Sequence, residues 1–86
     1  MTTITVYSTT WCGDCRNLKR FFAEEGIEYS EIDIDQNESA ARQVIAWSGG
    51  KRVIPTLHIT NDKDSPVILH NPKLHDLQVI LKRMNE

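Results

Sequence analysis

The stretch WCGDC at residues 11–15 decides how this chain is interpreted, because it holds the only two cysteines of the sequence. It directly follows an alternating run at residues 3–7 (TITVY), which predicts a strand. A helix that begins at Cys12 would place both sulfur atoms on its first turn, near unpaired backbone N–H groups at the positive end of the helix dipole. The Cys12 thiol is then expected to ionise more easily than a free cysteine, with Cys15 close enough to form a disulfide. This arrangement predicts a reversible pair suited to thiol–disulfide exchange.

Length, composition and charge limit the number of domains and the kinds of binding partner. With 86 residues, positions 1–86 are expected to form a single domain with one modest core. A net charge of −2 gives no electrostatic basis for binding nucleic acid or an anionic membrane. No basic segment followed by an apolar stretch opens the sequence, and no apolar run approaches the roughly 20 residues that span a bilayer. We therefore expect a cytoplasmic protein, and we expect it to be a monomer.

The number of cysteines argues against structural disulfides and for a redox or metal site. Two cysteines are too few for a disulfide scaffold in a chain of this size. In a reducing cytosol, a C-x-x-C pair indicates redox or metal chemistry.

Strand and helix signals alternate in the first half of the chain. Apolar residues at helical spacing cover residues 13–25, and Gly26 follows as a helix stop. A second strand is expected at about residues 28–33. Residues 35–38 offer N-cap side chains for a second helix, which should end at the glycine pair 49–50.

The second half predicts a hairpin and a last helix. Residues 56–60 and 66–69 have strand character, and a polar loop joins them. Asn71 and Pro72 are expected at the N-cap and the first position of the last helix. The order β-α-β-α-β-β-α predicts an α/β protein with a four-stranded mixed sheet covered by helices. This layout resembles the minimal thioredoxin-like fold.

The chain resembles the glutaredoxin family over nearly its whole length. The resemblance rests on the first strand, the WCGDC stretch that opens a helix, and residues 49–56 (GGKRVIPT). In glutaredoxins the proline of the second stretch is cis and lies beside the active disulfide, and Pro55 matches that position. The backbone N–H and C=O just before this proline pair with the substrate like an added strand, and Ile54 would supply them here.

These arguments lead to a set of candidate site residues. Cys12 is expected to attack a mixed disulfide, and Cys15 to resolve it in a dithiol route. No metal ligand and no bound cofactor is expected; the co-substrate is a small thiol, and the partners are proteins that carry mixed disulfides. The candidate substrate-binding residues are Trp11, Gly13, Asp14, Arg52, Val53, Ile54, Pro55 and Asn71.

Within the family, the chain is most similar to the mycoredoxins, which use mycothiol. Glutathione-using members carry a lysine three residues before the first cysteine, where this chain has Thr9. They also carry a glycine pair and an acid before the last helix, where residues 70–72 read HNP. Both changes would remove recognition of the charged ends of glutathione. Asp14 stands where an aromatic residue is common, and its charge would oppose the Cys12 thiolate unless Arg52 offsets it.

Two other functions remain open. One is a thioredoxin-like electron donor that reduces protein disulfides, such as that of ribonucleotide reductase. The other is a non-catalytic carrier of a metal or an iron–sulfur cluster, although a single C-x-x-C with three scattered histidines is a weak metal signal. Trp11 is interpreted as a platform beside the substrate and Trp47 as a core residue, and Arg52 either binds substrate or is simply solvated.

Overall fold

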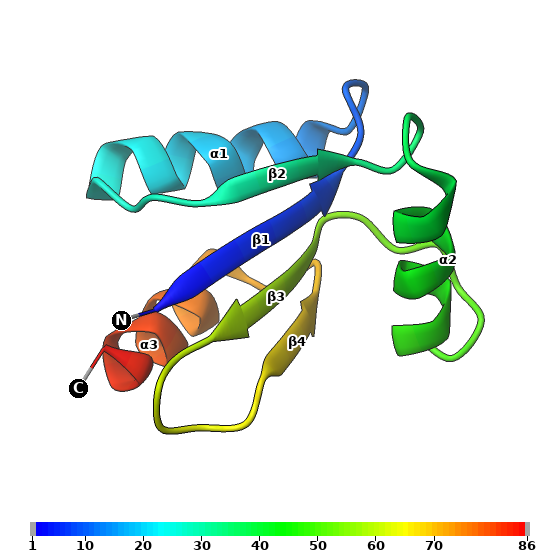
Figure 1. Cartoon of the computed structure of the whole chain (residues 1–86). Helices are drawn as coiled ribbons and strands as arrows, with labels where there is room; N and C mark the ends of the chain where they lie inside the picture. Colours follow the sequence, from blue (N-terminus) through cyan, green and yellow to red (C-terminus); the bar gives the residue numbers. More distant parts are fainter. Residues whose placement is uncertain (1, 86) are drawn as a thin grey trace.

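The computed structural model describes residues 2–85 and contains one sheet and three helices (Figure 1). Its elements follow the predicted order β-α-β-α-β-β-α. They are β1 (Thr3–Ser8), α1 (Gly13–Glu25), β2 (Ser30–Asp33), α2 (Glu38–Trp47), β3 (Thr56–Thr60), β4 (Val67–His70) and α3 (Leu74–Met84).

The sheet is mixed, with the strand order β2-β1-β3-β4. β1 pairs in parallel with β2 and antiparallel with β3, so that Val6 lies between Glu31 and Leu57. β4 continues the sheet antiparallel to β3, with Leu69 opposite Leu57. The four-stranded mixed sheet of the prediction is confirmed. Since β1 is an inner strand, its carboxyl end delivers the WCGDC stretch close to the end of β2 and the start of β3.

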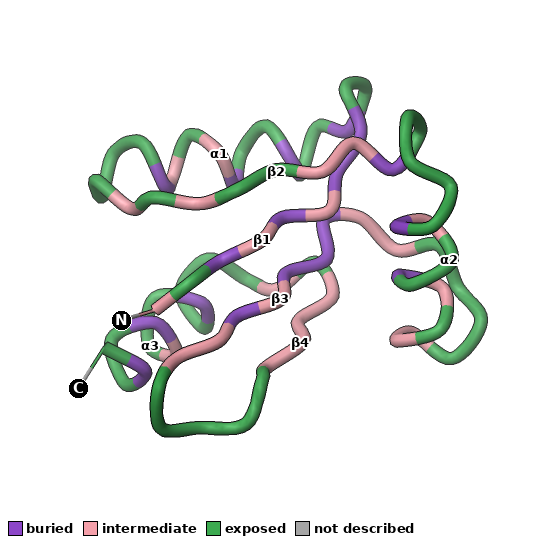
Figure 2. Tube along the Cα trace, in the orientation of Figure 1, coloured by how far each residue is buried: buried purple, intermediate pink, exposed green. Residues whose placement is uncertain are grey.

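Each face of the sheet is covered by different helices. Because successive side chains of a strand point to opposite faces, Val6 and Tyr7 of β1 enter separate cores. α1 and α3 pack on the Val6 face, and α2 packs on the Tyr7 face; Figure 2 shows the buried segments on the strands and helices. The buried residues of the larger core are Ile4, Val6, Leu18, Phe22, Leu57, Ile59, Leu77, Leu81 and Met84. Burial of this apolar surface is the main favourable contribution to folding.

Three predicted boundaries need correction. β2 begins at Ser30, because the chain after Gly26 still packs against α1: the Ile27 N–H donates to the Phe22 carbonyl oxygen at 2.9 Å. β4 begins at Val67, since Pro66 has no N–H for the strand ladder. The last helix begins at Leu74, and its N-cap is Lys73.

The remaining helix boundaries agree with the sequence. α1 ends at Gly26, which has the left-handed conformation (φ 65°) that glycine adopts without a side-chain clash. The Asn37 side chain caps α2 by accepting from the Ala40 N–H at 3.0 Å. Trp47, at the end of α2, stacks on His58 with ring centroids 5.4 Å apart, which agrees with its predicted packing role. Among the described residues, no helix is both long and apolar enough to span a bilayer.

Candidate functional site

The two cysteines lie at the start of α1, as their spacing predicts. Cys12 is the N-cap residue, with extended backbone angles (φ −84°, ψ 116°), and α1 follows from Gly13. Its sulfur accepts a hydrogen bond from the Cys15 backbone N–H at 3.0 Å. Cys12 and Cys15 form a disulfide with their Cα atoms 5.2 Å apart, within the ordinary range for such bonds. The helix start thus provides an N–H donor for a negative charge on Cys12 once the disulfide is reduced.

The two sulfur-bearing residues differ in access to solvent. Cys15 is fully buried, whereas Cys12 keeps 7% of its surface exposed. This difference agrees with the predicted order of reactivity, since an incoming disulfide must reach the attacking sulfur. Gly13, the next residue, has room around it: a β-carbon built there would meet nothing within 4 Å.

Residues 53–56 form a strap that enters β3. The Ile54–Pro55 peptide bond is cis, as the family resemblance implies. The Thr56 hydroxyl donates to the Val53 carbonyl oxygen at 2.8 Å, and the Asn71 N–H donates to the Pro55 carbonyl oxygen at 2.7 Å. In residues 2–85, no backbone hydrogen bond involves the N–H or C=O of Ile54. These two groups are therefore free to pair with an extended segment of another molecule.

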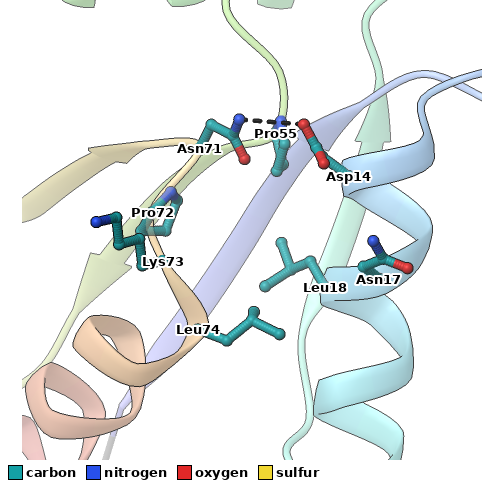
Figure 3. A pocket seen from close by; sticks show the side chains of 8 residues that line it. All are labelled: Asp14, Asn17, Leu18, Pro55, Asn71, Pro72, Lys73 and Leu74. Atoms are coloured by element: carbon teal, nitrogen blue, oxygen red, sulfur yellow. Dashed lines mark hydrogen bonds between the residues drawn. The ribbon is translucent and has the colours of Figure 1, made fainter.

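A groove of about 400 Å³ runs between the start of α1 and the β4–α3 corner (Figure 3). The Asn71 side-chain amide donates to Asp14 Oδ2 at 3.2 Å at one end of the groove. The Lys73 ammonium points away from α1 in this view. The lining residues are Asp14, Asn17, Leu18, Pro55, Asn71, Pro72, Lys73 and Leu74.

The prediction that Asn71 caps the last helix is wrong. Asn71 has a positive φ of 44°, a conformation that asparagine tolerates better than most residues. Its backbone pairs with Pro55 and its side chain with Asp14, so neither is available to α3. Lys73 is the N-cap instead, and it makes no side-chain capping bond. Asn71 therefore belongs to the edge of the groove.

A second cluster of polar groups lies beside Cys12. The Trp11 indole N–H donates to Asp35 Oδ2 at 2.8 Å, and Arg52 Nη2 donates to Asp35 Oδ1 at 2.6 Å. The Arg52 guanidinium, and after it the Trp11 N–H, holds the pKa of the Asp35 carboxyl below its ordinary value of 3.8. Arg52 thus pairs with Asp35, whereas the sequence had suggested that it offsets Asp14. Trp11 remains 63% exposed beside the cysteine.

Sequence reasoning missed Asp35 as a site residue. It lies in the stretch 35–38, which was interpreted only as a source of helix caps. The one available signal was that Asp35 follows the end of a strand parallel to β1, and such strand ends meet at the same edge of a sheet.

Directly beneath the site, a polar network joins β1, β2 and α1. The Ser8 hydroxyl donates to Glu31 Oε2 at 2.7 Å, and the Lys19 ammonium lies 2.9 Å from the same oxygen. The Ser8 hydroxyl is the largest cause that lowers the pKa of Glu31 below 4.5, and Lys19 acts in the same direction against the effect of burial. Thr9, the next residue, is buried, and its hydroxyl has no hydrogen-bond partner in the part of the chain that the structure describes.

The described residues include no group of three or more histidine, cysteine or acidic side chains placed to hold a metal ion. The arrangement that they do contain is a disulfide at a helix start, a strap in which the Ile54 N–H and C=O make no backbone hydrogen bond, and a groove lined by apolar and polar side chains.

Comparison with known proteins agrees with this geometry. A family model described as glutaredoxin matches residues 4–63. The chain belongs to the glutaredoxin family. A Mycobacterium tuberculosis protein that has been assigned to the glutaredoxins is 33% identical to this glutaredoxin over 81 residues, which cover 94% of this chain and 92% of the relative. Mycoredoxin 1 of Corynebacterium glutamicum is 38% identical over 74 residues, which cover 79% of this chain and 91% of the relative.

Comparison with solved structures supports the thioredoxin-like fold. The thioredoxin Deadhead of Drosophila melanogaster superposes on this glutaredoxin with a TM-score of 0.73 over 96% of this chain and 80% of its own; at 16% identity, it supports the thioredoxin-like fold alone. Glutaredoxins are thiol–disulfide oxidoreductases that act on protein mixed disulfides with a small thiol such as glutathione or mycothiol. This glutaredoxin is an enzyme of that class, with Cys12 and Cys15 as its C-x-x-C pair.

Proposed function

We propose that this glutaredoxin removes mycothiol from protein mixed disulfides, with Cys12 as the attacking thiol. The observation that carries the proposal is the position of Cys12: it caps α1, is the more exposed of the two cysteines, and lies two residues before Asp14, which lines the groove together with Asn17 and Asn71. The similarity to mycoredoxin 1 supports the choice of mycothiol.

In the first step, the Cys12 thiolate attacks the mycothiol sulfur of the mixed disulfide. A Cys12–mycothiol disulfide forms, the substrate's S–S bond breaks, and the target protein leaves as a thiolate that takes up a proton. The Cys15 N–H, which lies 3.0 Å from the Cys12 sulfur in the oxidised form, is placed to stabilise the attacking thiolate.

The second step has two routes. In the monothiol route, a second mycothiol thiolate attacks the mycothiol sulfur, so that mycothiol disulfide leaves and Cys12 is regenerated. In the dithiol route, the Cys15 thiolate attacks the Cys12 sulfur, mycothiol leaves, and the Cys12–Cys15 disulfide of the present structure forms. A reducing thiol must then restore the dithiol.

The surrounding residues receive binding roles under this proposal. Ile54 would pair its free N–H and C=O with the substrate backbone, supported by Val53 and Pro55 on either side. The open space at Gly13 would leave room for the incoming disulfide, and the exposed Trp11 ring would cover its apolar part.

The choice of thiol follows from the charges at the groove. Mycothiol carries an amide-linked sugar and inositol in place of the charged ends of glutathione. Hydroxyl groups can donate to the Asp14 carboxylate and bond with the amides of Asn17 and Asn71. A carboxylate-bearing ligand would instead meet the negative charge of Asp14 at the α1 side of the groove, since the Lys73 ammonium points away from α1. The lysine of glutathione users is replaced by Thr9, which is buried.

The proposal is tested with one carrier peptide that bears either a mycothiol cap or a glutathione cap, and with a plain peptide disulfide as the third substrate. The second-order rate constant of the reduced protein should be at least about tenfold higher for the mycothiol cap, because mismatched polar contacts commonly cost that much. A preference for the glutathione cap would contradict the choice of thiol. Fast reaction with the plain disulfide alone would favour a thioredoxin-like electron donor.

Two further measurements test the remaining parts of the proposal. Protein purified without oxygen should show no visible absorbance, whereas a bound iron–sulfur cluster would absorb and favour the carrier function. We also propose that residues 1–86 form a single domain and that the protein acts as a monomer in the cytoplasm. Size-exclusion chromatography with light scattering should then give the mass of one chain, and a dimer would contradict this part.

A further inference from the structure

Both carboxylate oxygens of Asp35 are occupied by residues that flank the active cysteine. Oδ1 accepts from Arg52 Nη2 at 2.6 Å, and Oδ2 accepts from Trp11 Nε1 at 2.8 Å. Trp11 adjoins Cys12 in the chain, and Arg52 directly precedes the strap at residues 53–56. Asp35 lies in the β2–α2 connection. It thus links the residue before Cys12 with the residue before the strap.

The contact between Asp35 and Arg52 bears on the positive charge beside the strap. Arg52 lies next to the strap, and its side chain is 40% exposed, so without a partner it would present a cation to an incoming ligand. With Asp35 in contact, the guanidinium is matched by a carboxylate at hydrogen-bond distance. A carboxylate on the substrate would have to compete with Asp35 for the same donors.

We propose that Asp35 determines specificity through the charge of the small thiol: by holding Arg52, it keeps this cation from carboxylate-bearing caps and so favours uncharged ones. The inference rests on the proposed removal of small-thiol caps and deepens it. Asp35 acts through Arg52 and Trp11 and is therefore a positioning residue.

The neighbouring carboxylates act in the same direction, and one neighbouring cation opposes them. Asp33 accepts from the Asp35 backbone N–H at 2.9 Å, which adds a second carboxylate to this edge of the sheet, and Asp14 stands on the first turn of α1. Lys51 is exposed and adds one positive charge next to Arg52. Asp35 is ionised at neutral pH, and Arg52, followed by Trp11, lowers its pKa further below 3.8. Both partners of the pair are therefore charged at neutral pH.

The test uses Asp35→Asn, which keeps the size of the side chain and an oxygen acceptor but removes its charge. Two caps of similar size on one carrier peptide serve as probes: 2-mercaptoethanol, which is neutral, and 3-mercaptopropionate, which is anionic. The measured quantity is the ratio of the two second-order rate constants for cap removal. Asp35→Asn should raise the anionic-to-neutral ratio about three- to tenfold, and added salt should reduce this gain because the interaction is exposed.

Two further variants separate a local effect of Arg52 from a general effect of charge. Glu38→Gln removes one negative charge from the exposed start of α2, where Glu38 pairs with Arg42, and should leave the ratio within about twofold of the wild-type value. In Asp35→Asn combined with Arg52→Gln, the gain of the single variant should disappear. An unchanged ratio in Asp35→Asn, an equal gain in Glu38→Gln, or a gain that persists without Arg52 would each overturn the inference.

This experiment also distinguishes the inference from the function on which it rests. If the wild-type protein removes both caps and the ratio does not respond to Asp35→Asn, the specificity role fails and the proposed chemistry stands. If the wild-type protein removes neither cap, the proposed chemistry fails, and the role of Asp35 fails with it.

Discussion

The Thr56 hydroxyl lies 2.8 Å from His70 Nδ1 and also 2.8 Å from the carbonyl oxygen of Val53. A hydroxyl carries a single hydrogen and a carbonyl oxygen can only accept, so that hydrogen goes to Val53. His70 must then donate from Nδ1 to the Thr56 oxygen. The end of β4 is thereby tied to the strap at residues 53–56.

Replacing Thr56 by valine should destabilise the protein and weaken the strap. Thr56 is fully buried, so Thr56→Val leaves the Val53 carbonyl and the His70 N–H without their partner. The expected loss in the free energy of unfolding is about 1–3 kcal/mol, measured by urea denaturation. Thr60→Val, at the other end of β3, is the control and should change stability by less than about 0.5 kcal/mol. Equal effects of the two substitutions would contradict the role of this hydrogen-bond pair.

The sequence predicted the order of the elements because their signals are local. Gly26 marks a helix end, residues 35–38 mark a helix start, and the alternation in residues 3–7 marks a strand; each was confirmed, with Asn37 as the N-cap of α2. The Cys12–Cys15 disulfide was predicted for the same reason, since its geometry follows from two positions on one helical turn.

The contacts of the site could not be predicted in the same way. Asn71 carries a strong local signal for a helix cap, but it bonds with Asp14, which is 57 positions away in the chain. Asp35 accepts hydrogen bonds from Trp11 and Arg52, which lie in separate connections. No spacing in the sequence indicates these contacts. Such contacts depend on which strand ends meet, and this is known only once the sheet is assembled.

Removing the charge of Asp14 should make Cys12 more acidic. Asp14 lies on the first turn of α1, two positions after Cys12, and a nearby negative charge disfavours a thiolate. Asp14→Asn should lower the pKa of the Cys12 thiol by a few tenths of a unit to about one unit. The change is measured by thiolate absorbance against pH in the reduced protein. Asp76→Asn, on the first turn of α3, is the control. A rise in the pKa of Cys12 would contradict the account.

Stability should fall in acid partly through Glu31. Its pKa is lowered by Ser8 and by Lys19, so the folded state binds a proton less readily than the unfolded chain. The resulting stabilisation is complete above 4.5, the ordinary pKa, and is lost as the pH falls through the lower folded value. The Glu31 side chain is 36% exposed, so solvent screening keeps this contribution to about 0.5 kcal/mol or less.

The measurement for Glu31 is the free energy of unfolding in urea at several pH values below neutrality. Glu31→Gln should be less stable than the wild type near neutral pH, and the difference should shrink as the pH falls below 4.5. Glu24→Gln removes the same charge from an exposed position of α1 and should keep a constant offset from the wild type. A Glu31→Gln difference that does not depend on pH would refute this assignment.

The most direct test of the account asks which sulfur of the substrate Cys12 attacks. Reduced Cys15→Ser protein is mixed with a peptide that carries a mycothiol cap, and the products are identified by mass spectrometry. Because Cys15 cannot resolve the intermediate, the account predicts mycothiol bound to Cys12 and a free peptide thiol, with no product from Cys12→Ser. Peptide bound to Cys12, or an adduct that still forms in Cys12→Ser, would contradict it.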